Sequence, residues 1–422
     1  MLDLAFIRDN PDRVRAAVQS KREKVDLDRI LALDAELRKL RAGVENLRME
    51  RNAASEAVGK LKKEGKPADE IVAKTRGLGD RIKSAEEAMR PVEAELQELL
   101  RWVPNCPASD VPVGVGSEDN VEVRRWGAKR EFAETPLAHW DICSRLDIVD
   151  FERGARLAGS GFMLFKGHGA RLERALINFM LDLHTKEHHY TEISPPAVAN
   201  SVVMTGSAQL PKLEADMYRL KGNDLYLIPT GEVPLVNIHA GEILDHKRLP
   251  LYYTAYTSCF RREAGAAGKD TRGLIRVHQF DKVELVKVVR PEKSYEELES
   301  LVANAERVLQ LLGLHYRVVK LCTGDMSFAS AKTYDLEAWA PGVGAWLEVS
   351  SCSNVEDFQA RRANIRFRDD DKKVKYVHLL NGSGLALPRI VIALLENYQR
   401  PDGGVDLPEP LRPYMGGLET LR

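Results

Sequence analysis

The sequence predicts an α+β protein: an antiparallel coiled-coil arm at the N-terminus, then a domain built on an antiparallel β-sheet with flanking helices. Two long N-terminal segments carry apolar residues at spacings of three and four, as coiled coils do. Beyond them, strand-like and helix-like runs follow one another without the regular βαβ alternation of parallel sheets. A stretch rich in proline and glycine separates the two regions.

Composition limits the kind of protein this is. A chain of 422 residues predicts two or three domains, and its net charge of −1 means that nucleic-acid binding would need a local basic patch. The five cysteines are odd in number and scattered, which is typical of a reducing cytosol, and no C-x-x-C pair offers a zinc site. The N-terminus lacks a signal peptide, and no run of about 18 apolar residues predicts a membrane span. We therefore expect a cytoplasmic protein that does not contact a membrane.

The first region predicts a helical hairpin. A short helical lead begins at Asn10-Pro11, and the first long helix is expected over about Ile30 to Lys62. Gly59 to Asp69 predicts the turn. The first seam comprises Ile30, Leu33, Leu37, Leu40, Val44 and Leu47. The second seam comprises Leu78, Ile82, Ala85, Met89, Val92, Leu96 and Leu99.

Basic residues gather near the expected tip of this hairpin. The candidates are Arg48, Arg51, Lys60, Lys62 and Lys63. They suit either the ordinary solvated face of a coiled coil or contacts to the phosphates of a nucleic acid.

Residues 103–118 hold three prolines and two glycines and predict a linker. We therefore expect an N-terminal domain over 1–102 and a second domain over 119–422. In the second domain, helices are predicted for Leu172–His188, Tyr295–Leu312 and Leu387–Asn397. Strands are predicted for Leu225–Ile228, Arg317–Lys320, Tyr334–Trp339 and Ala345–Ser351.

The segment from Tyr252 to Lys287 reads as strand, loop, strand. Its first strand is expected over Tyr252–Phe260, a loop over Ala264–Gly273, and a second strand from Leu274 onwards. Alternation along the second strand places a set of polar and aromatic residues on one face: Arg276, His278, Phe280, Lys282 and Glu284. That face suits a flat, anionic ligand, or else it is the solvated side of an antiparallel sheet.

Three further stretches carry chemical groups: Thr230-Gly-Glu232, Trp346 to Cys352, and Leu380 to Arg389, which predicts a glycine-bearing turn leading into a helix. Together with the Tyr252–Lys287 segment they supply arginines, acids and small hydroxyls, without a Ser-His-Asp set. This composition suits nucleotidyl transfer, where catalysis is mainly positioning and charge stabilisation. The H-x-x-E-H pattern at His184–His188 could place two histidines on one helix face, but it has no clear third metal ligand.

The order and wording of these stretches resemble seryl-tRNA synthetases of the common bacterial type, which are class II aminoacyl-tRNA synthetases. The resemblance covers essentially the whole chain. Three stretches match the class II motifs: Leu176–Pro196, Phe260–Glu263 with Arg276–Phe280, and Gly382–Arg389. Four stretches match seryl-specific patterns: Thr230–Glu232, His278–Glu284, Glu348–Arg362 and Leu380–Gly384.

The resemblance implies roles for individual residues, with Arg261, Glu348 and Arg389 catalytic. The implied ATP site comprises Arg261, Arg262, Glu263, Val277, Phe280, Glu348, Val349, Ser350, Ser351 and Arg389. The implied serine site comprises Thr230, Gly231, Glu232, Arg261, Glu284 and Ser383. Glu348 and Ser351 would hold Mg²⁺ with ATP, and no zinc is expected.

The implied activity is ligation of L-serine to tRNA(Ser) through seryl-adenylate, by a homodimer whose arm binds the tRNA. Whether tRNA(Sec) is also a substrate stays open. Two residues depart from many relatives, Arg262 and Pro388, and two residues on the predicted face receive no role, His278 and Lys282. The alternatives are a paralogue that loads a carrier protein, which would have no use for the arm, and a non-catalytic RNA-binding relative.

Overall fold

The computed structural model describes residues 1–264 and 272–422. These residues form two compact units, Leu2–Pro104 and Asn105–Arg422, with Met1 counted in the second unit. The loop predicted between Ala264 and Gly273 lies largely outside the described residues. No helix among the described residues is long and apolar enough to cross a membrane.

The first unit consists of four helices: α1 (Leu4–Asp9), α2 (Pro11–Ser20), α3 (Leu27–Lys63) and α4 (Asp69–Leu100). Pro11 occupies the first turn of α2, where its missing N–H is not needed, so the predicted helix start is confirmed. The Asp3 and Asp26 carboxylates cap α1 and α3 by accepting backbone N–H groups of the first turn.

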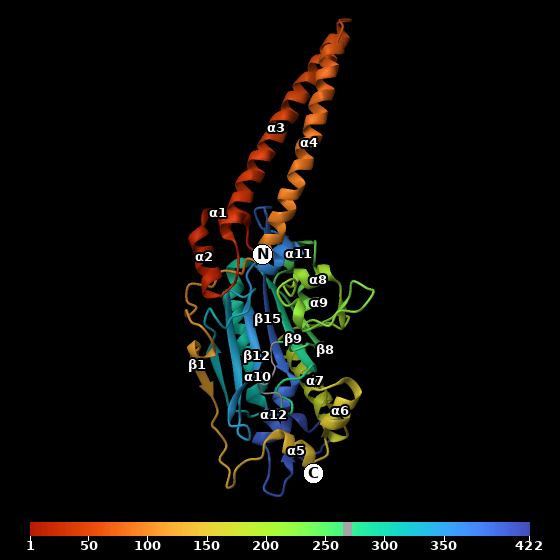
Figure 1. Ribbon diagram of the computed structural model, residues 1–422. Helices are drawn as coiled ribbons and strands as arrows, with labels where there is room; N and C mark the ends of the chain where they lie inside the picture. The colour runs from red at the N-terminus through yellow and green to blue at the C-terminus, as the bar shows by residue number, and fades with distance from the viewer. Residues whose placement is uncertain (265–271) are drawn as a thin grey trace. The chain divides into compact units, whose positions relative to one another are not determined.

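The two long helices form the predicted antiparallel hairpin (Figure 1). Both seams turn inward, and ion pairs bridge the helices at Arg29–Glu95, Arg41–Glu93 and Arg48–Glu86, with N···O distances of 2.7–2.9 Å. The 37 residues of α3 span about 55 Å at 1.5 Å per residue. Helix α3 continues to Lys63, so the turn occupies only 64–68 and the predicted turn from Gly59 was too long.

The basic residues near the turn are not equivalent. Arg48 is neutralised across the hairpin by Glu86 at 2.7 Å. Arg51, Lys60, Lys62 and Lys63 are exposed, and no described carboxylate forms an ion pair with any of them. Of the five predicted cations, four are therefore available to an external anion.

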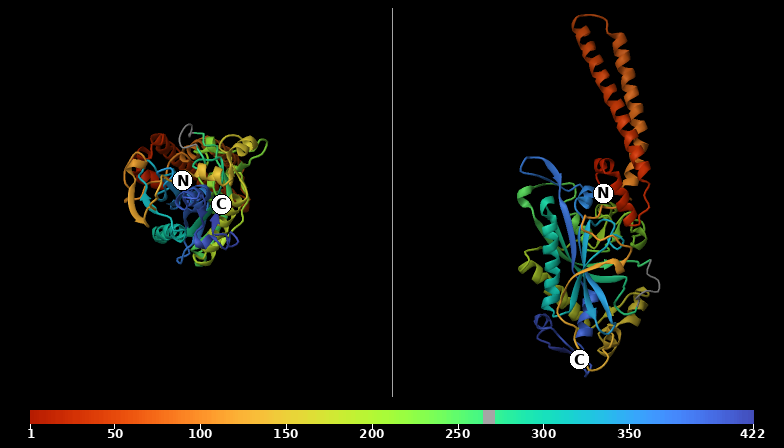
Figure 2. Two further views of the ribbon diagram at one scale, coloured as in Figure 1. Left: turned by 90° about the horizontal axis from the view of Figure 1, so that it is seen from below. Right: turned by 90° about the vertical axis from the view of Figure 1, so that its left-hand side faces the viewer.

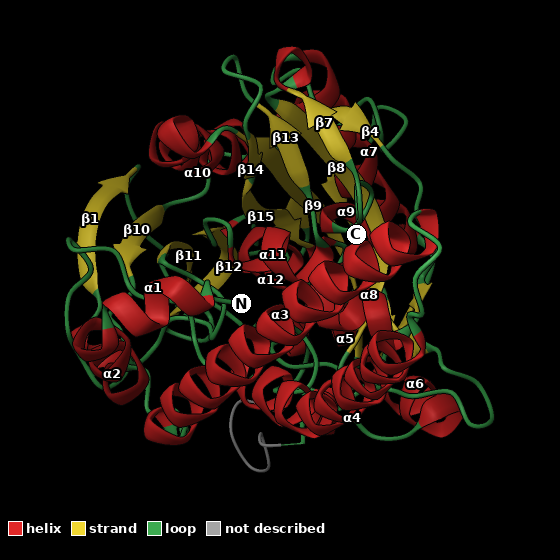
Figure 3. Ribbon diagram, turned by 90° about the horizontal axis from the view of Figure 1, so that it is seen from above, coloured by secondary structure: helices red, strands yellow, loops and turns green. Residues whose placement is uncertain are grey.

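The second unit is organised by an eight-stranded sheet in the order β1-β10-β11-β12-β15-β9-β8-β4, and Figure 3 shows the strands following this order across the view. All neighbouring pairs are antiparallel except β4 with β8. The bounds are β1 Val121–Trp126, β10 Tyr316–Lys320, β11 Lys332–Ala340, β12 Ala345–Asn354, β15 His378–Ala386, β9 Gln279–Val289, β8 Leu251–Phe260 and β4 Thr191–Glu192.

Three helices cover one face of this sheet: α7 (His168–Lys186), α10 (Ser294–Leu311) and α12 (Leu387–Asn397). Their apolar sides share one core with inward residues of the strands, among them Leu285, Leu336 and Val349. Figure 2 shows α10 running alongside the strands. Because side chains alternate along each strand, the opposite face is left for polar groups.

Shorter elements complete the second unit. The helices are α5 His139–Arg145, α6 Phe151–Ala158, α8 Ser201–Gly206, α9 Glu232–Val236 and α11 Phe358–Ala363. The short strands are β2 Val149–Asp150, β3 Leu164–Phe165, β5 Val198–Ala199, β6 Tyr226–Leu227, β7 Ile243–Asp245, β13 Arg366–Arg368, β14 Val374–Tyr376, β16 Val405–Asp406 and β17 Thr420–Leu421.

The structure confirms most predicted elements, and α12 has the predicted ends. Besides the turn of the hairpin, two predictions were wrong. Leu380–Ala386 is not a turn but most of β15, and glycine suits it because a Cβ at Gly382 would lie 2.9 Å from the Cys352 sulfur. The chain from Leu274 to His278 is not extended either, so β9 begins only at Gln279.

The segment predicted as a linker is held along the second unit from Asn105 onwards. The buried Asn105 amide donates to the carbonyls of Ala329 and Val355, both at 2.9 Å. Further along, the Thr323 N–H donates to the Pro112 carbonyl at 2.9 Å. Proline limits the conformations of this segment, and these bonds fix its path.

Candidate active site

The sheet brings the four chemically marked stretches together on the face opposite the core helices. Lys282 and Glu284 of β9 pair with Thr257 and Ala255 of β8, and Ser383 of β15 pairs with Glu284. One strand further, β12 lies beside β15, with Gly382 opposite Cys352 on the core side of the sheet. Segments as far apart in sequence as Glu284 and Ser383 thus become neighbours through strand register, and the loop of Thr230 is hydrogen-bonded to Glu284 beside them.

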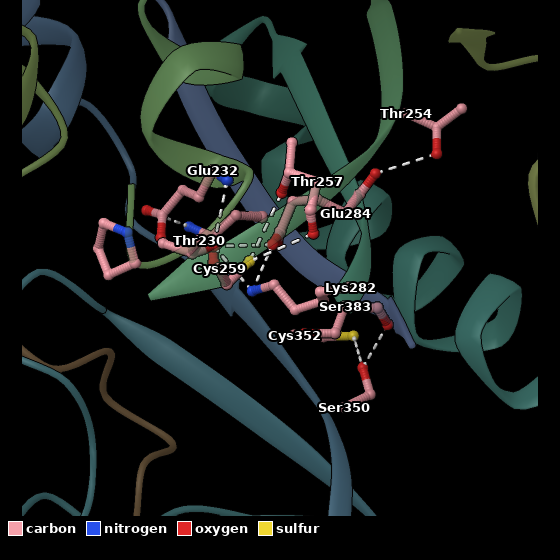
Figure 4. Close-up of polar contacts among 12 residues, drawn as sticks. Thr230, Glu232, Thr254, Thr257, Cys259, Lys282, Glu284, Ser350, Cys352 and Ser383 are labelled. Atoms are coloured by element: carbon pink, nitrogen blue, oxygen red, sulfur yellow. Dashed lines mark hydrogen bonds and ion pairs between the residues drawn. The ribbon is translucent and has the colours of Figure 1, made fainter. Parts of the chain in front are cut away.

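A buried charged cluster lies at the centre of this face (Figure 4). The Lys282 ammonium donates to Thr230 Oγ1 at 2.7 Å and forms an ion pair with Glu284 Oε2. Thr230 in turn donates to Glu284 Oε2 at 2.8 Å. Glu284 and Lys282 are only 2% and 6% exposed, so each charge depends on the other for compensation.

Glu232 is a second carboxylate in the same pocket. One of its oxygens accepts hydrogen bonds from the Gln359 amide at 2.5 Å and the Asn381 amide at 3.1 Å. Burial, and then the negative charge of Glu284, raise the pKa of Glu232 to about 7. Gly231 leaves room beside them, because a Cβ there would lie 3.0 Å from the Cβ of Glu284.

The end of β8 supplies an arginine above an aromatic ring. The Arg261 guanidinium lies 5.1 Å from the centroid of the Phe280 ring, and its Nε donates to the Pro229 carbonyl at 3.2 Å. Glu263 follows with φ of 51° and pairs with Arg276 at 2.7 Å. This arrangement brings an aromatic ring and two arginines together, which suits a nucleotide base and its phosphates.

Motif residues from β12 and α12 meet beside this surface. Arg389, in the first turn of α12, lies 3.2 Å from Glu348 Oε2 and donates to the Glu348 carbonyl at 2.7 Å. Pro388 occupies the same first turn without disturbing it. The nearby Asp335 of β11 pairs with Ser351 in register.

The environment of Asp335 suits a cation. Its Oδ1 is buried without a hydrogen-bond partner, and its residue is 8% exposed. Burial, and then the charge of Glu348, raise the pKa of Asp335. Glu348, Ser351 and Asp335 together present the oxygen donors that Mg²⁺ prefers, although the described residues contain no cluster of three or more His, Cys, Asp or Glu side chains arranged to hold a metal.

Some predicted site residues do not present their side chains to this surface. Val277 and Val349 are 6% and 1% exposed and belong to the core, so only their backbone is available to a ligand. The Ser350 hydroxyl is buried and donates to the Ser383 carbonyl at 2.6 Å. Arg262 is exposed, and its backbone N–H donates to the Asp216 carbonyl at 2.8 Å.

Sequence reasoning missed four side chains of the site: Lys282, Gln359, Asn381 and Asp335. Lys282 lay on the predicted face, and its position two residues before Glu284 could have indicated that the two side chains are neighbours. Asn381 and Gln359 lay inside the quoted seryl-specific stretches, whereas nothing in the sequence marked Asp335 beyond its place in a strand. His278, also left without a role, bonds to the Tyr218 hydroxyl at 2.8 Å and stacks on Phe162.

The two histidines of the H-x-x-E-H pattern are partners of each other. His184 Nδ1 lies 3.0 Å from His188 Nδ1, and His184 Nε2 lies 3.0 Å from the Gly384 carbonyl. Burial lowers the pKa of His184 to about 3. Both ring nitrogens of His184 are thus used in hydrogen bonds, Nδ1 with His188 and Nε2 with Gly384 of β15.

Two family models match the chain. The model described as "Seryl-tRNA synthetase N-terminal domain" matches residues 1–107, and the model described as "tRNA synthetase class II core domain (G, H, P, S and T)" matches residues 215–398. A serine–tRNA ligase of Carboxydothermus hydrogenoformans is 56% identical over 417 residues, covering 99% of this chain and 98% of that protein. One from Geobacter sulfurreducens is 55% identical over 422 residues and all of both chains.

Solved structures agree with these matches. A crystal structure of seryl-tRNA synthetase from Pyrococcus horikoshii complexed with ATP is similar with a TM-score of 0.93 and 40% identity, over 100% of this chain and 99% of that one. A cytoplasmic serine–tRNA ligase from Naegleria fowleri in complex with AMP is similar with a TM-score of 0.88 and 30% identity, over the same shares.

The raised pKa of Glu232 predicts that Glu232→Gln stabilises the protein without ligand at pH 8 more than at pH 5. The unfolded carboxyl loses its proton near pH 4.5 and the folded one near pH 7. As the pH rises between these values, ionisation increasingly favours the unfolded chain, by roughly 3 kcal/mol at most and less where solvent reaches the side chain. The amide carries no such cost.

Urea unfolding at pH 5, 6.5 and 8 measures this difference. The exposed Glu214→Gln serves as a control and should leave the pH dependence of the free energy of unfolding unchanged. Parallel pH curves for wild type and Glu232→Gln would contradict the assigned pKa.

Proposed function

Because the chain belongs to the seryl-tRNA synthetase family of class II aminoacyl-tRNA synthetases, we infer that it joins serine to tRNA using ATP. The observation that carries this proposal is the pocket formed by Thr230, Glu232, Lys282 and Glu284 beside Arg261. It combines two carboxylates with one resident lysine. A second positive charge, the α-ammonium of an amino acid, would complete its balance.

Serine fits this pocket by charge and by hydrogen bonding. Glu284 receives the ammonium, and Arg261 holds the carboxylate. The serine hydroxyl lies against Glu232 and Ser383, where Asn381 and Gln359 already hold the Glu232 carboxylate in place. Alanine would leave these buried polar groups unpaired, and a site of this kind can discriminate by about 10⁴-fold or more.

ATP lies with its adenine on Phe280, and the phosphates reach the arginines. The serine carboxylate oxygen attacks the α-phosphorus, a new P–O bond forms, and the bond to the leaving pyrophosphate breaks. Arg261 neutralises charge at the α-phosphate, and Arg389 meets the γ-phosphate. Glu263 contacts the adenine side. The protein supplies position and charge and forms no covalent intermediate of its own.

Glu348 and Ser351 are the residues we propose to hold Mg²⁺, and the unpartnered Asp335 Oδ1 beside them supports a cation there. When bound with ATP, Mg²⁺ neutralises phosphate charge. In the second step, a terminal ribose hydroxyl of tRNA attacks the seryl carbonyl, and AMP leaves with its phosphate oxygen.

The remaining partners are also part of the proposal. The hairpin arm binds tRNA(Ser), and tRNA(Sec) is a second candidate for the same arm. We propose a cytoplasmic homodimer that pairs through Leu176–Pro196. The arm, matched by its own family model, argues against a paralogue that loads a carrier protein. Arg261, Glu348 and Arg389 argue against a non-catalytic relative.

The first reaction step predicts exchange of labelled pyrophosphate into ATP that depends on serine. In a panel of the twenty amino acids, serine should support exchange about 10⁴-fold better than alanine or more, because the hydroxyl partners are buried. Threonine should be excluded by size. Absence of exchange with serine would overturn the proposed function.

The exposed cations of the hairpin tip predict a selective loss of tRNA binding. Changing Arg51, Lys60, Lys62 and Lys63 to Gln should weaken tRNA affinity and reduce its dependence on salt, because fewer counterions are released. Serine-dependent exchange should not change.

Arg48→Gln is the matched control, since Glu86 already neutralises Arg48 at 2.7 Å. Its effect on tRNA affinity should be much smaller than that of the other tip cations. An unchanged affinity and salt slope in the fourfold variant would rule out phosphate contacts at the tip.

A further inference from the structure

A buried histidine, His139, holds the segment of the chain that leads into β9. His139 is the first residue of α5 and is fully buried. Its Nδ1 lies 2.9 Å from Glu396 Oε1, and its Nε2 accepts the backbone N–H of Leu274 at 3.1 Å. Leu274 lies two residues before Arg276.

The hydrogen bonds of His139 decide which of its ring nitrogens carries the proton. Nε2 must carry a lone pair because the Leu274 N–H points at it, so the proton resides on Nδ1 and is donated to Glu396. Glu396 is also fully buried and accepts the N–H groups of His139 at 2.9 Å, Gly342 at 2.8 Å and Val343 at 3.0 Å. This carboxylate is fully bonded, which makes it a rigid support for the imidazole.

The same short segment is attached to α12 at a second point. The Arg389 Nε donates to the Ile275 carbonyl at 3.5 Å, and Arg389 also holds the Glu348 carbonyl. Glu396 lies two turns further along α12. Helix α12 is therefore bonded to this segment at two points. Glu396 reaches Leu274 through His139, and Arg389 bonds directly to Ile275.

Two neighbouring contacts require α5 to lie close to Arg272 and Gly273. Gly273, with φ of +71°, lies against the imidazole, and a Cβ there would lie 2.2 Å from His139 Nε2. The Arg272 guanidinium lies 4.5 Å from the centroid of the Trp140 ring. Immediately beyond this attachment, Arg276 forms its 2.7 Å ion pair with Glu263.

We propose that His139 is a positioning residue for ATP: the Glu396–His139–Leu274 connection sets Arg276 and Glu263 relative to Arg389 across the nucleotide. This inference rests on the proposed function of the site. The hydrogen bonds of His139 go to Glu396 and Leu274 and to none of Thr230, Glu232, Lys282 and Glu284, so we expect the connection to affect ATP and not serine. A buried N–H without its acceptor destabilises the segment that carries it, and a displaced cation weakens phosphate contacts.

Two substitutions separate the two hydrogen bonds of the imidazole. In His139→Asn the amide can still donate to Glu396 but is too short to reach Leu274. In His139→Gln the longer side chain can place its oxygen where Nε2 lies and accept from Leu274. Gly273→Ala disturbs the same contact without changing the histidine, because the added Cβ would collide with the imidazole of His139.

The experiment measures KM for ATP and for serine in pyrophosphate exchange, with thermal unfolding of each variant and calorimetric titration of a non-hydrolysable ATP analogue without serine. His139→Asn and Gly273→Ala should raise KM for ATP and the analogue Kd about tenfold, the effect of one lost hydrogen bond. KM for serine should stay within twofold. His139→Gln should recover most of the ATP affinity.

His378→Asn is the matched control, because His378 is partly buried and bonds to Ser294 Oγ at 2.8 Å, away from α12. It should leave both KM values unchanged. Unchanged ATP affinity in folded His139→Asn, or equal rises of KM for ATP and serine, would overturn the inference. Wild-type enzyme without serine-dependent exchange would instead refute the proposed function, while the analogue titration would still test His139.

Discussion

The buried ion pair of Lys282 and Glu284 is the constraint on which the rest of the site depends. Two carboxylates, Glu232 and Glu284, share a pocket in which Lys282 is the resident cation. Lys282 keeps one carboxylate compensated, while burial, and then the charge of Glu284, raise the pKa of Glu232 to about 7 in the protein without ligand. An incoming ammonium would offset this excess of negative charge, so the electrostatics of the pocket favour an amino acid.

The sheet makes this arrangement possible by separating two environments across one layer. Leu285 faces the α7–α10–α12 core, while Glu284, its neighbour in sequence, faces the pocket. The antiparallel pairing of β8, β9, β15 and β12 converts four distant stretches into adjacent rows. Glycines in β15 allow the core side of this central strand to approach Cys352 and His184 closely. Packing on one face thereby fixes geometry on the other.

Much of this could be predicted from the sequence, for definite physical reasons. Heptad spacing reports helix pairing directly, so the hairpin was predicted within a few residues. Strand parity placed Phe280, Lys282 and Glu284 on one face. Parity failed for Arg276 and His278, because tertiary bonds to His139 and Tyr218 hold that segment in turns. Glycines made β15 resemble a turn, although here they serve close packing. Asp335 could not be identified from the sequence, because only its pairing with Ser351 in the sheet places it beside the site.

Lys282→Met most directly tests whether the resident lysine sets the pocket. Without the Lys282 ammonium, the buried Glu284 carboxylate loses the partner that holds it beside Thr230, so the site for the serine ammonium is no longer fixed in place. KM for serine in pyrophosphate exchange should rise at least tenfold, with KM for ATP unchanged. Lys287→Met is the control, because that buried lysine on the same strand pairs with Glu297 instead. It should leave KM for serine unaffected. A wild-type KM for serine in Lys282→Met would contradict the account.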